Sequence, residues 1–272
     1  MRSIACIAAL LFYLHSYAVN DNDPVGARSG GLGHASVSIS DFWSLYNNQA
    51  GLAFLESPFA GISYENRFLR PELGRNFIGV AIPTNSGTVA FSLKSFGVHS
   101  YSEGKYGFSY ARKLAEKMAL GVQLNYMTIT QRGDLGNKNS ITAEIGFQAE
   151  IMEDLDIGVH VFNPTVSGLT DEPVENIPTV FRVGAKYTIS DKVFVVAESE
   201  KDTQRPAFFK TGLEYHVHDK LYLRGGVSTN PTQSSFGFGL NLKNVRVDFA
   251  ASYHQTLHYI PQFSLSYQFN KE

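Results

Sequence analysis

Hydrophobic and polar residues alternate one by one through most of this chain, from about Ser57 to the C-terminus. In residues 120–126, LGVQLNY, every second residue is Leu, Val or Tyr, and Gly, Gln and Asn stand between them. Residues 245–253, VRVDFAASY, and 263–269, FSLSYQF, largely repeat this pattern. A period of two places successive side chains on opposite faces of a β-strand. Each segment is therefore predicted to be a strand with one apolar and one polar face.

About fourteen such segments follow one another, and their connections alternate in length. Short turns are predicted around residues 84–86, 116–117, 153–154, 190–192, 218–220 and 243–244. Longer loops are predicted around residues 69–73, 97–104, 131–139, 164–178, 200–207, 228–234 and 255–261. Short turns at one end and longer loops at the other are typical of outer-membrane barrels. The sequence thus predicts an all-β fold, a transmembrane antiparallel β-barrel of about 14 strands.

A soluble β-sandwich or soluble barrel is the alternative, because its strands also alternate. Its core would have to bury many Tyr side chains, whose hydroxyl groups need hydrogen-bond partners. On a lipid-facing wall the same rings are well placed at the two membrane interfaces. The tyrosine content therefore favours the membrane barrel.

The N-terminus predicts export and then a separate small segment. Residues 1–18 comprise a basic start, an apolar run and the small residues Ser16 and Ala18 at the −3 and −1 positions of a cleavage site, which is typical of a signal peptide. We expect residues 19–56 to form a plug and residues 57–272 to form the barrel, in the cell outer membrane. Cys6 is the only cysteine of the chain and lies in the predicted signal peptide, which excludes a disulfide framework.

The predicted plug centres on residues 26–53, a glycine-dense stretch that contains Trp43, the only tryptophan. Its glycines indicate tight bends or close backbone approach. A short helix is predicted through residues 42–46, capped by Ser40 or Asp41. Asn47 and Asn48 are expected in a turn, because Asn tolerates left-handed conformations. The candidate plug residues are Arg28, Gly30, Gly31, Gly33, Trp43, Asn48 and Gly51.

The polar faces of the later strands carry charges of both signs, which we expect to point into the barrel. This predicted luminal cluster comprises Glu144, Arg182, Lys186, Glu198, Lys210, Glu214, His216, Arg224, Arg246, Asp248 and His254. Neighbouring strands can pair opposite charges directly, so one hypothesis is a structural network that holds barrel and plug together. The other is a pore whose charged rings select what passes.

Composition narrows the classes of function. A formal net charge of −2 offers no basic face for nucleic acid, so no nucleic-acid partner is expected. Asp248, Ser252 and His254 share one strand face, but residues two apart lie about 6–7 Å apart, beyond the reach of a nucleophile and its base. We therefore predict a protein that is not an enzyme, with no cofactor and no metal.

The N-terminal stretch resembles the corresponding segment of FadL-like outer-membrane barrels, and more closely that of the PorV/PorQ proteins. Similar pieces are residues 27–33, ARSGGLG, and 48–53, NQAGLA. Further similarity lies in residues 181–184, FRVG, 210–215, KTGLEY, and 221–226, LYLRGG. Together these pieces are distributed over nearly the whole chain beyond the predicted signal peptide.

This resemblance implies a fourteen-stranded barrel with an N-terminal plug, surrounded by outer-membrane lipid. The PorV/PorQ resemblance implies a non-enzymatic role in type IX protein secretion or surface attachment, with secretion-machinery proteins as partners. The FadL resemblance implies the alternative, a passive channel for hydrophobic small molecules. Gln49 stands where the family usually has proline, so the turn after the plug is expected to be less rigid.

Overall fold

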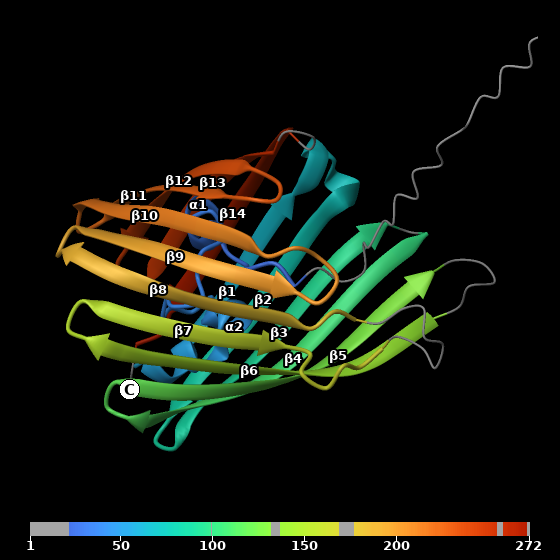
Figure 1. The fold of residues 1–272 in the computed structure, drawn as a ribbon, viewed down its shortest axis with the longest axis horizontal. Coiled ribbons are helices and arrows are strands. Elements are labelled where there is room, and N and C mark those ends of the chain that lie inside the picture. Colours follow the sequence, from blue (N-terminus) through green and yellow to red (C-terminus); the bar gives the residue numbers. More distant parts are fainter. Residues whose placement is uncertain (1–21, 99, 132–136, 169–176, 255–257, 271–272) are drawn as a thin grey trace, which may run out of the picture.

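The chain folds into a closed barrel of fourteen antiparallel strands around its own N-terminal segment (Figure 1). The computed structural model describes residues 22–98, 100–131, 137–168, 177–254 and 258–270. The predicted signal peptide, residues 1–18, lies outside these described residues. The predicted fold class, an all-β barrel of fourteen strands, is confirmed.

The strands have the following bounds: β1 Phe59–Asn66, β2 Gly74–Thr84, β3 Gly87–Val98, β4 Tyr101–Ala115, β5 Met118–Gln131, β6 Asn137–Met152, β7 Leu155–Phe162, β8 Val180–Ser190, β9 Val193–Asp202, β10 Phe208–His218, β11 Leu221–Ser228, β12 Gln233–Leu242, β13 Val245–His254 and β14 His258–Gln268. Each strand pairs with its neighbours in sequence, and β1 closes the barrel on β14. Closure leaves no unpaired sheet edge, as a spanning sheet in lipid requires.

The apolar face of each strand points outward. On β5, Leu120, Val122 and Leu124 are exposed, whereas Gln123 and Asn125 are buried inside the barrel. This is the reverse of a soluble sandwich and makes the outer wall a lipid-facing surface. Among the described residues, the helices are all too short to cross a membrane.

Large aromatic side chains lie toward both ends of the outer wall. Tyr187 and Tyr215 lie near the short turns, and Phe181 and Phe209 lie near the longer loops; all four are exposed. Aromatic rings at the two ends of an apolar band are typical of the two membrane interfaces.

The loop predicted at residues 97–104 was wrong, and the one predicted at residues 255–261 was too long, since β14 begins at His258. A loop was expected at residues 97–104, but β3 continues to Val98 and β4 already begins at Tyr101, which pairs with it. Gly97 has φ +128°, a conformation that favours glycine, so the chain can bend sharply there. The two glycines and two serines of this stretch hid the strand ends from the alternation pattern.

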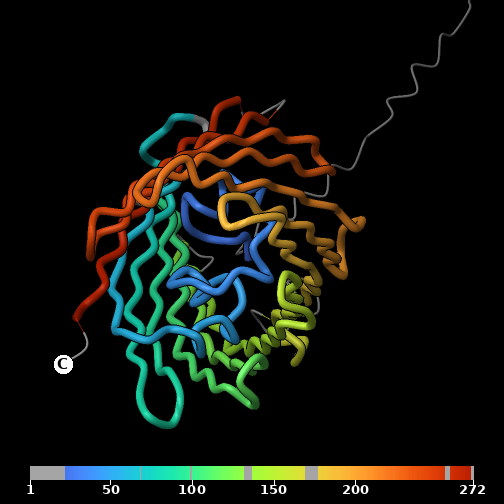
Figure 2. Tube along the Cα trace, turned by 90° about the vertical axis from the view of Figure 1, so that its left-hand side faces the viewer, coloured from blue at the N-terminus to red at the C-terminus, as the bar shows by residue number. Residues whose placement is uncertain are grey.

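Residues 22–58 lie inside the barrel, as the view from the short-turn end shows (Figure 2). We call this segment the plug. It contains helix α1 (Ala27–Gly31), helix α2 (Ser44–Asn47) and a 3-10 helix, η1 (Gln49–Phe54). Two more 3-10 turns, η2 (Arg67–Leu69) and η3 (Pro71–Leu73), lie in the β1–β2 connection.

The plug has an apolar core of its own, which Phe42, Trp43, Leu45 and Tyr46 form against Phe77 of β2. The predicted helix at residues 42–46 begins two residues later, at Ser44. Asp41 still accepts a hydrogen bond from the backbone N–H of Trp43 at 2.8 Å.

The predicted left-handed turn at Asn47 and Asn48 was wrong. Asn47 is helical and Asn48 is extended, with φ −166°. Their side chains are used as buried hydrogen-bonding groups instead. Asn47 accepts from the Val25 N–H at 2.7 Å and donates to the Val25 carbonyl at 3.1 Å. Inside the barrel, the side chain of Asn47 therefore binds the backbone of Val25, 22 residues away in sequence, and does not stabilise a local turn.

Candidate functional site

A buried ion pair between Arg28 of α1 and the barrel wall holds the plug in place. The guanidinium of Arg28 donates two hydrogen bonds to the carboxylate of Glu214 on β10, at 2.9 and 2.8 Å, and pairs with Asp41 at 3.0 Å. Burial alone would lower the pKa of Arg28, but Glu214 and Asp41 outweigh it and raise the pKa. Arg28 is therefore a permanent cation at this contact.

Backbone groups of the plug are also held by the wall. Both N–H groups of Ser36 and Val37 donate to one carboxylate oxygen of Glu198, at 2.8 and 2.9 Å. The side chain of Gln148 donates to the carbonyl of Val37 at 2.9 Å. Within the plug, the side-chain amide of Asn48 donates to the same carbonyl at 2.7 Å. These bonds satisfy the polar backbone of a segment that has little regular secondary structure.

A third contact joins η1 to strands β4–β7. The carboxylate of Glu144 lies fully buried, 2.5 Å from Lys105 Nζ and 2.9 Å from His160 Nε2. Gln49 of the plug donates to the same carboxylate at 2.9 Å. The resemblance led us to expect a less rigid turn at Gln49, because the family usually has proline there. In the structure, the hydrogen bond from Gln49 to Glu144 holds this turn against the wall.

The structure places the predicted luminal cluster on the inner wall, but in separate groups. Glu214, Arg224, Asp248 and Arg246 form a chain of pairs at 2.6, 2.7 and 3.1 Å that continues the Arg28 contact. His216 lies 3.0 Å from Glu214 at the edge of this group.

The other predicted luminal residues lie elsewhere around the wall. Lys210 pairs with Glu198 at 3.0 Å and with Glu200 at 2.6 Å, and Glu200 also pairs with Arg182 at 2.9 Å. Lys186 pairs with Asp156 at 2.6 Å. His254 lines a cavity at the loop end.

Glycines of the wall allow the plug to lie directly against the strands. At nine glycine positions of the wall, an added Cβ atom would lie 3.2 Å or less from plug atoms. They are Gly61, Gly79, Gly121, Gly146, Gly158, Gly184, Gly212, Gly226 and Gly237. We call this set the glycine ring. It matches the shape of the plug around most of the barrel.

Most of the candidate plug residues take part in this close fit. Gly33 has φ +67°, and a Cβ there would lie 2.9 Å from the backbone nitrogen of Val227. Gly31 faces Gly237, and Gly30 faces Gln262. Trp43 lies in the plug core, whereas Gly51 packs against Ser44 within the plug and Gln148 on the wall.

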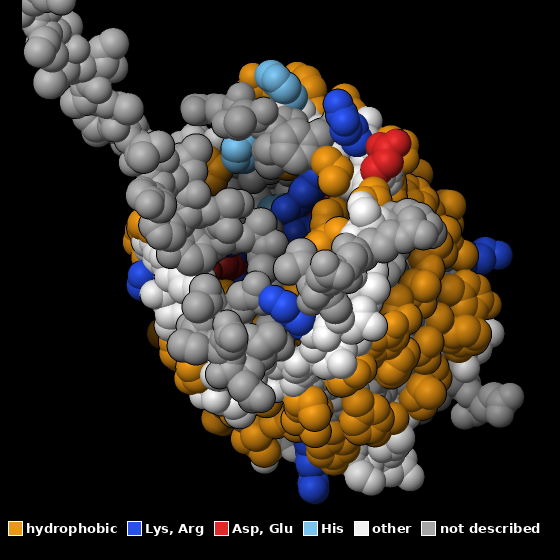
Figure 3. All heavy atoms as spheres, turned by 90° about the vertical axis from the view of Figure 1, so that its right-hand side faces the viewer, with side chains coloured by type: hydrophobic (Ala, Val, Ile, Leu, Met, Phe, Trp, Pro, Cys, Tyr) orange, Lys and Arg blue, Asp and Glu red, His pale blue; other side chains and the backbone are white. Residues whose placement is uncertain are grey.

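A cavity of about 370 Å³ opens above the plug at the loop end; we call it the mouth cavity. Figure 3 looks onto this end, where basic side chains lie in the hollowed centre and apolar side chains cover the outer wall. Its lining combines apolar side chains, among them Phe208 and Ile260, with charged ones, among them Glu65, Arg67 and Lys210. Such a lining suits a molecule with both apolar and polar parts.

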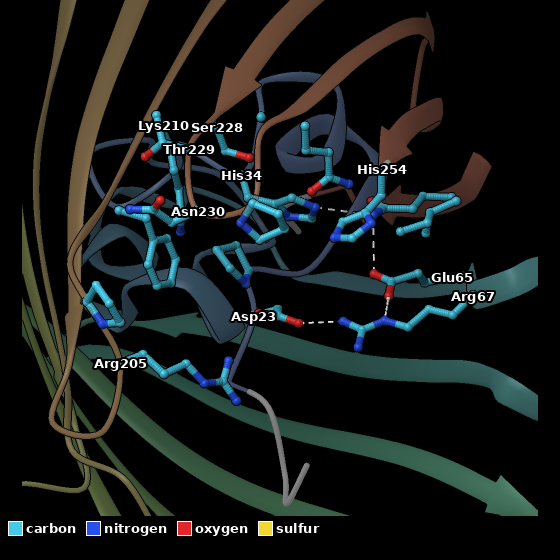
Figure 4. A pocket seen from close by; sticks show the side chains of 18 residues that line it. Asp23, His34, Glu65, Arg67, Arg205, Lys210, Ser228, Thr229, Asn230 and His254 are labelled. Carbon is cyan, nitrogen blue, oxygen red and sulfur yellow. Dashed lines mark hydrogen bonds and ion pairs between the residues drawn. The ribbon is translucent and has the colours of Figure 1, made fainter. Parts of the chain in front are cut away.

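Plug residues form part of this lining, as the close-up shows (Figure 4). Asp23 points toward Arg67 and lies 2.5 Å from it and 2.9 Å from Arg75. Burial raises the pKa of Asp23, but the two guanidinium groups outweigh it and hold the pKa well below its usual value. Burial lowers the pKa of His34, so at neutral pH the mouth presents a charged Asp23 and a neutral His34.

Sequence reasoning missed several residues of these contacts: Asp23, Gln49, Glu65, Arg75, Lys105 and Glu200. A signal was present for Glu65, Arg75, Lys105 and Glu200, since each stands at an alternate position of a strand. Lys105 lies just beyond the loop predicted at residues 97–104, in a segment where the alternation already indicates a strand. No local pattern marks Asp23 or Gln49 as a partner of a distant wall residue.

Comparison with known proteins finds similarity of fold. No family model matches the sequence, and no curated protein matches it. Among solved structures, the CymD monoaromatic hydrocarbon channel has a TM-score of 0.73 at 13% identity, covering 91% of this chain and 98% of its own. The Ralstonia pickettii toluene transporter TbuX has a TM-score of 0.70 at 12% identity, covering 92% and 100%. A Pseudomonas aeruginosa FadL homologue has a TM-score of 0.64 at 11% identity, covering 90% and 98%.

The fold and the site together define a class: a plugged membrane β-barrel with the FadL-like fold of known outer-membrane channels. At such low identity the likeness concerns the fold. The solved structures named above support a FadL-like fold, and they do not support the PorV/PorQ family specifically.

Proposed function

We propose that this protein is a passive, non-enzymatic outer-membrane channel that admits small hydrophobic or amphipathic molecules. The observation that carries the proposal is the mouth cavity, which lies above a plug inside a barrel with an apolar exterior. Its apolar walls would bind the body of such a molecule, and its charged groups would orient a polar end. The fold likeness to hydrocarbon channels supports the same function.

The alternative, a role in type IX secretion or surface attachment, rests on the sequence resemblance. Extraction from native membranes in mild detergent separates the two. A large protein that co-purifies in stoichiometric amount would support the secretion role. A lone barrel with bound lipid or fatty acid would support the channel.

A direct test of the channel is a substitution that fills the mouth cavity with a larger side chain. Ile260 lines the cavity, whereas Phe263 on the same strand faces the lipid. We expect Ile260→Trp to lower the uptake of the hydrophobic dye N-phenyl-1-naphthylamine by intact cells, and Phe263→Trp to leave uptake at the wild-type rate. The measurement is the rate of fluorescence increase at equal barrel content in the outer membrane. Equal rates for wild type, Ile260→Trp and cells without the barrel would contradict the proposal.

A further inference from the structure

Two cavities lie next to helix α1 along one wall of the barrel: Gly33 and His34, just beyond the helix, line one, and Arg28 within the helix lines the other. The mouth cavity reaches Gln262 of β14. A second cavity, of about 250 Å³, is lined by Ser266 of β14, Arg246 of β13 and Trp43 of the plug. Gln262 and Ser266 are four residues apart, about 13 Å along a strand. Along the β13–β14 wall, these lining residues of the two cavities are therefore separated by about 13 Å.

One row of side chains that face the lumen lies between them. The strand register pairs Asp248 with Ser264, between the pairs Ala250–Gln262 and Arg246–Ser266. On the other side of β14, Ser264 lies opposite Ser63 of β1. We call Ser63, Ser264 and Asp248 the partition row. All three are buried, and their side chains are short and polar.

Helix α1 of the plug packs against the partition row. The backbone N–H of Ala27 donates to Ser264 Oγ at 3.2 Å, at the long end of the usual range. Arg28, the strong anchor of α1, instead reaches Glu214 on β10. Asp248 of the partition row also pairs with Arg224 at 2.7 Å and with Arg246 at 3.1 Å, so fixed charges line this row.

Two buried polar atoms close to this route have no hydrogen-bond partner among the described residues. They are Ser252 Oγ, on the lumen-facing side of β13 between Ala250 and His254, and Trp43 Nε1. Both side chains are more than nine-tenths buried. Buried polar groups are normally satisfied by protein or by ordered water. Ser252 lies opposite Ile260, which lines the mouth cavity, and Trp43 lines the second cavity, so water at the two ends of the route would satisfy both atoms.

We propose that the partition row is the constriction of a polar conduit past the plug, which carries water and small ions between the mouth and the short-turn end. Its short polar side chains exclude a large apolar solute and hydrate a small polar one. The inference does not depend on hydrophobic uptake, because a hydrophobic molecule would find no apolar lining in the partition row.

Cysteine substitution tests this route in the folded protein. With Cys6→Ser as background, the chain has no other thiol. Ser264→Cys is nearly isosteric and places a thiol in the partition row. Ser109→Cys is the matched control: Ser109 is equally buried, but it lies on β4, where it donates to Gln123.

The measurement is ionic conductance in planar bilayers before and after the anionic reagent 2-sulfonatoethyl methanethiosulfonate. We expect the reagent to lower the conductance of Ser264→Cys at least twofold, with recovery after dithiothreitol, and to leave Ser109→Cys unchanged. Three results would overturn the proposal: a wild-type barrel without ion conductance, modification of Ser264→Cys without loss of current, or equal loss in both variants. Dye uptake tests the hydrophobic channel, and ionic conductance tests the polar conduit. Each proposal can therefore fail without the other.

Discussion

At the scale of single residues, the lumen depends on charges that are buried but paired. Glu214 is fully buried and contacts both Arg28 of the plug and Arg224 of the wall. Removing charges from water is costly, so such a pair adds little net stability over apolar packing. It does make one geometry far better than the others, because an unpaired buried carboxylate is strongly disfavoured. We infer that these pairs set where the plug sits.

Arg28→Met tests this at the plug. The substitution keeps much of the apolar stem but leaves Glu214 with one guanidinium fewer, so we expect plug docking to weaken by about 3–5 kcal/mol. Hydrogen exchange of the peptide that contains Val25 and Ala27 should then become faster. Arg112→Met, at an exposed position of β4, serves as control and should exchange as wild type does. Unchanged exchange in Arg28→Met would contradict the role of the pair.

At the scale of elements, strands and plug fit because the inner wall lacks side chains where the plug crosses it. Leu32 and Gly33 lie so close to Gly226 that a Cβ there would be 2.3 Å from their backbone atoms. Its neighbour Gly225 points outward and would meet nothing within 4 Å. The alternation of a strand thus places two adjacent glycines in opposite environments.

This pair of glycines provides a matched experiment. Gly226→Val should displace Leu32 and Gly33, just after α1, and cost about 1–3 kcal/mol through overpacking. Gly225→Val should be tolerated, since its side chain would enter open space on the outer wall. The temperature at which the barrel loses its folded gel migration measures both. A lower temperature for Gly225→Val than for Gly226→Val would show that the glycine ring is not what fits the plug.

At the scale of the whole molecule, the barrel supplies the closed wall and the plug supplies the contents of its lumen. Hydrogen bonds close the wall between β1 and β14 independently of the plug. We therefore expect the barrel to form without residues 26–53 and to have a wider open lumen.

Deletion of residues 26–53 tests that division of roles. We expect a folded barrel whose single-channel conductance in planar bilayers is several-fold above that of the wild type, because the plug no longer fills the lumen. Circular dichroism and gel migration establish that the variant is folded. A folded variant with wild-type conductance would rule out the plug as the barrier.

Much of the fold could be predicted from the sequence because alternation is a local property of a strand. The segments around residues 120–126 and 245–253 show it without any knowledge of their neighbours. The prediction was wrong where side chains are small and ambiguous, at residues 97–104. Local turn preference also predicted the wrong role for Asn47 and Asn48, because the barrel interior offered their side chains partners far away in sequence.

Local sequence patterns are enough to predict the barrel of about fourteen strands, the opposite polarity of its two faces and the glycine-dense N-terminal segment. Only the tertiary structure decided that Arg28 meets Glu214, that Gly226 faces the plug backbone, and where the two cavities lie. The physical reason is distance along the chain. Alternation acts between neighbouring residues, whereas plug contacts depend on the register of all strands and on the path of a segment that has no period of its own.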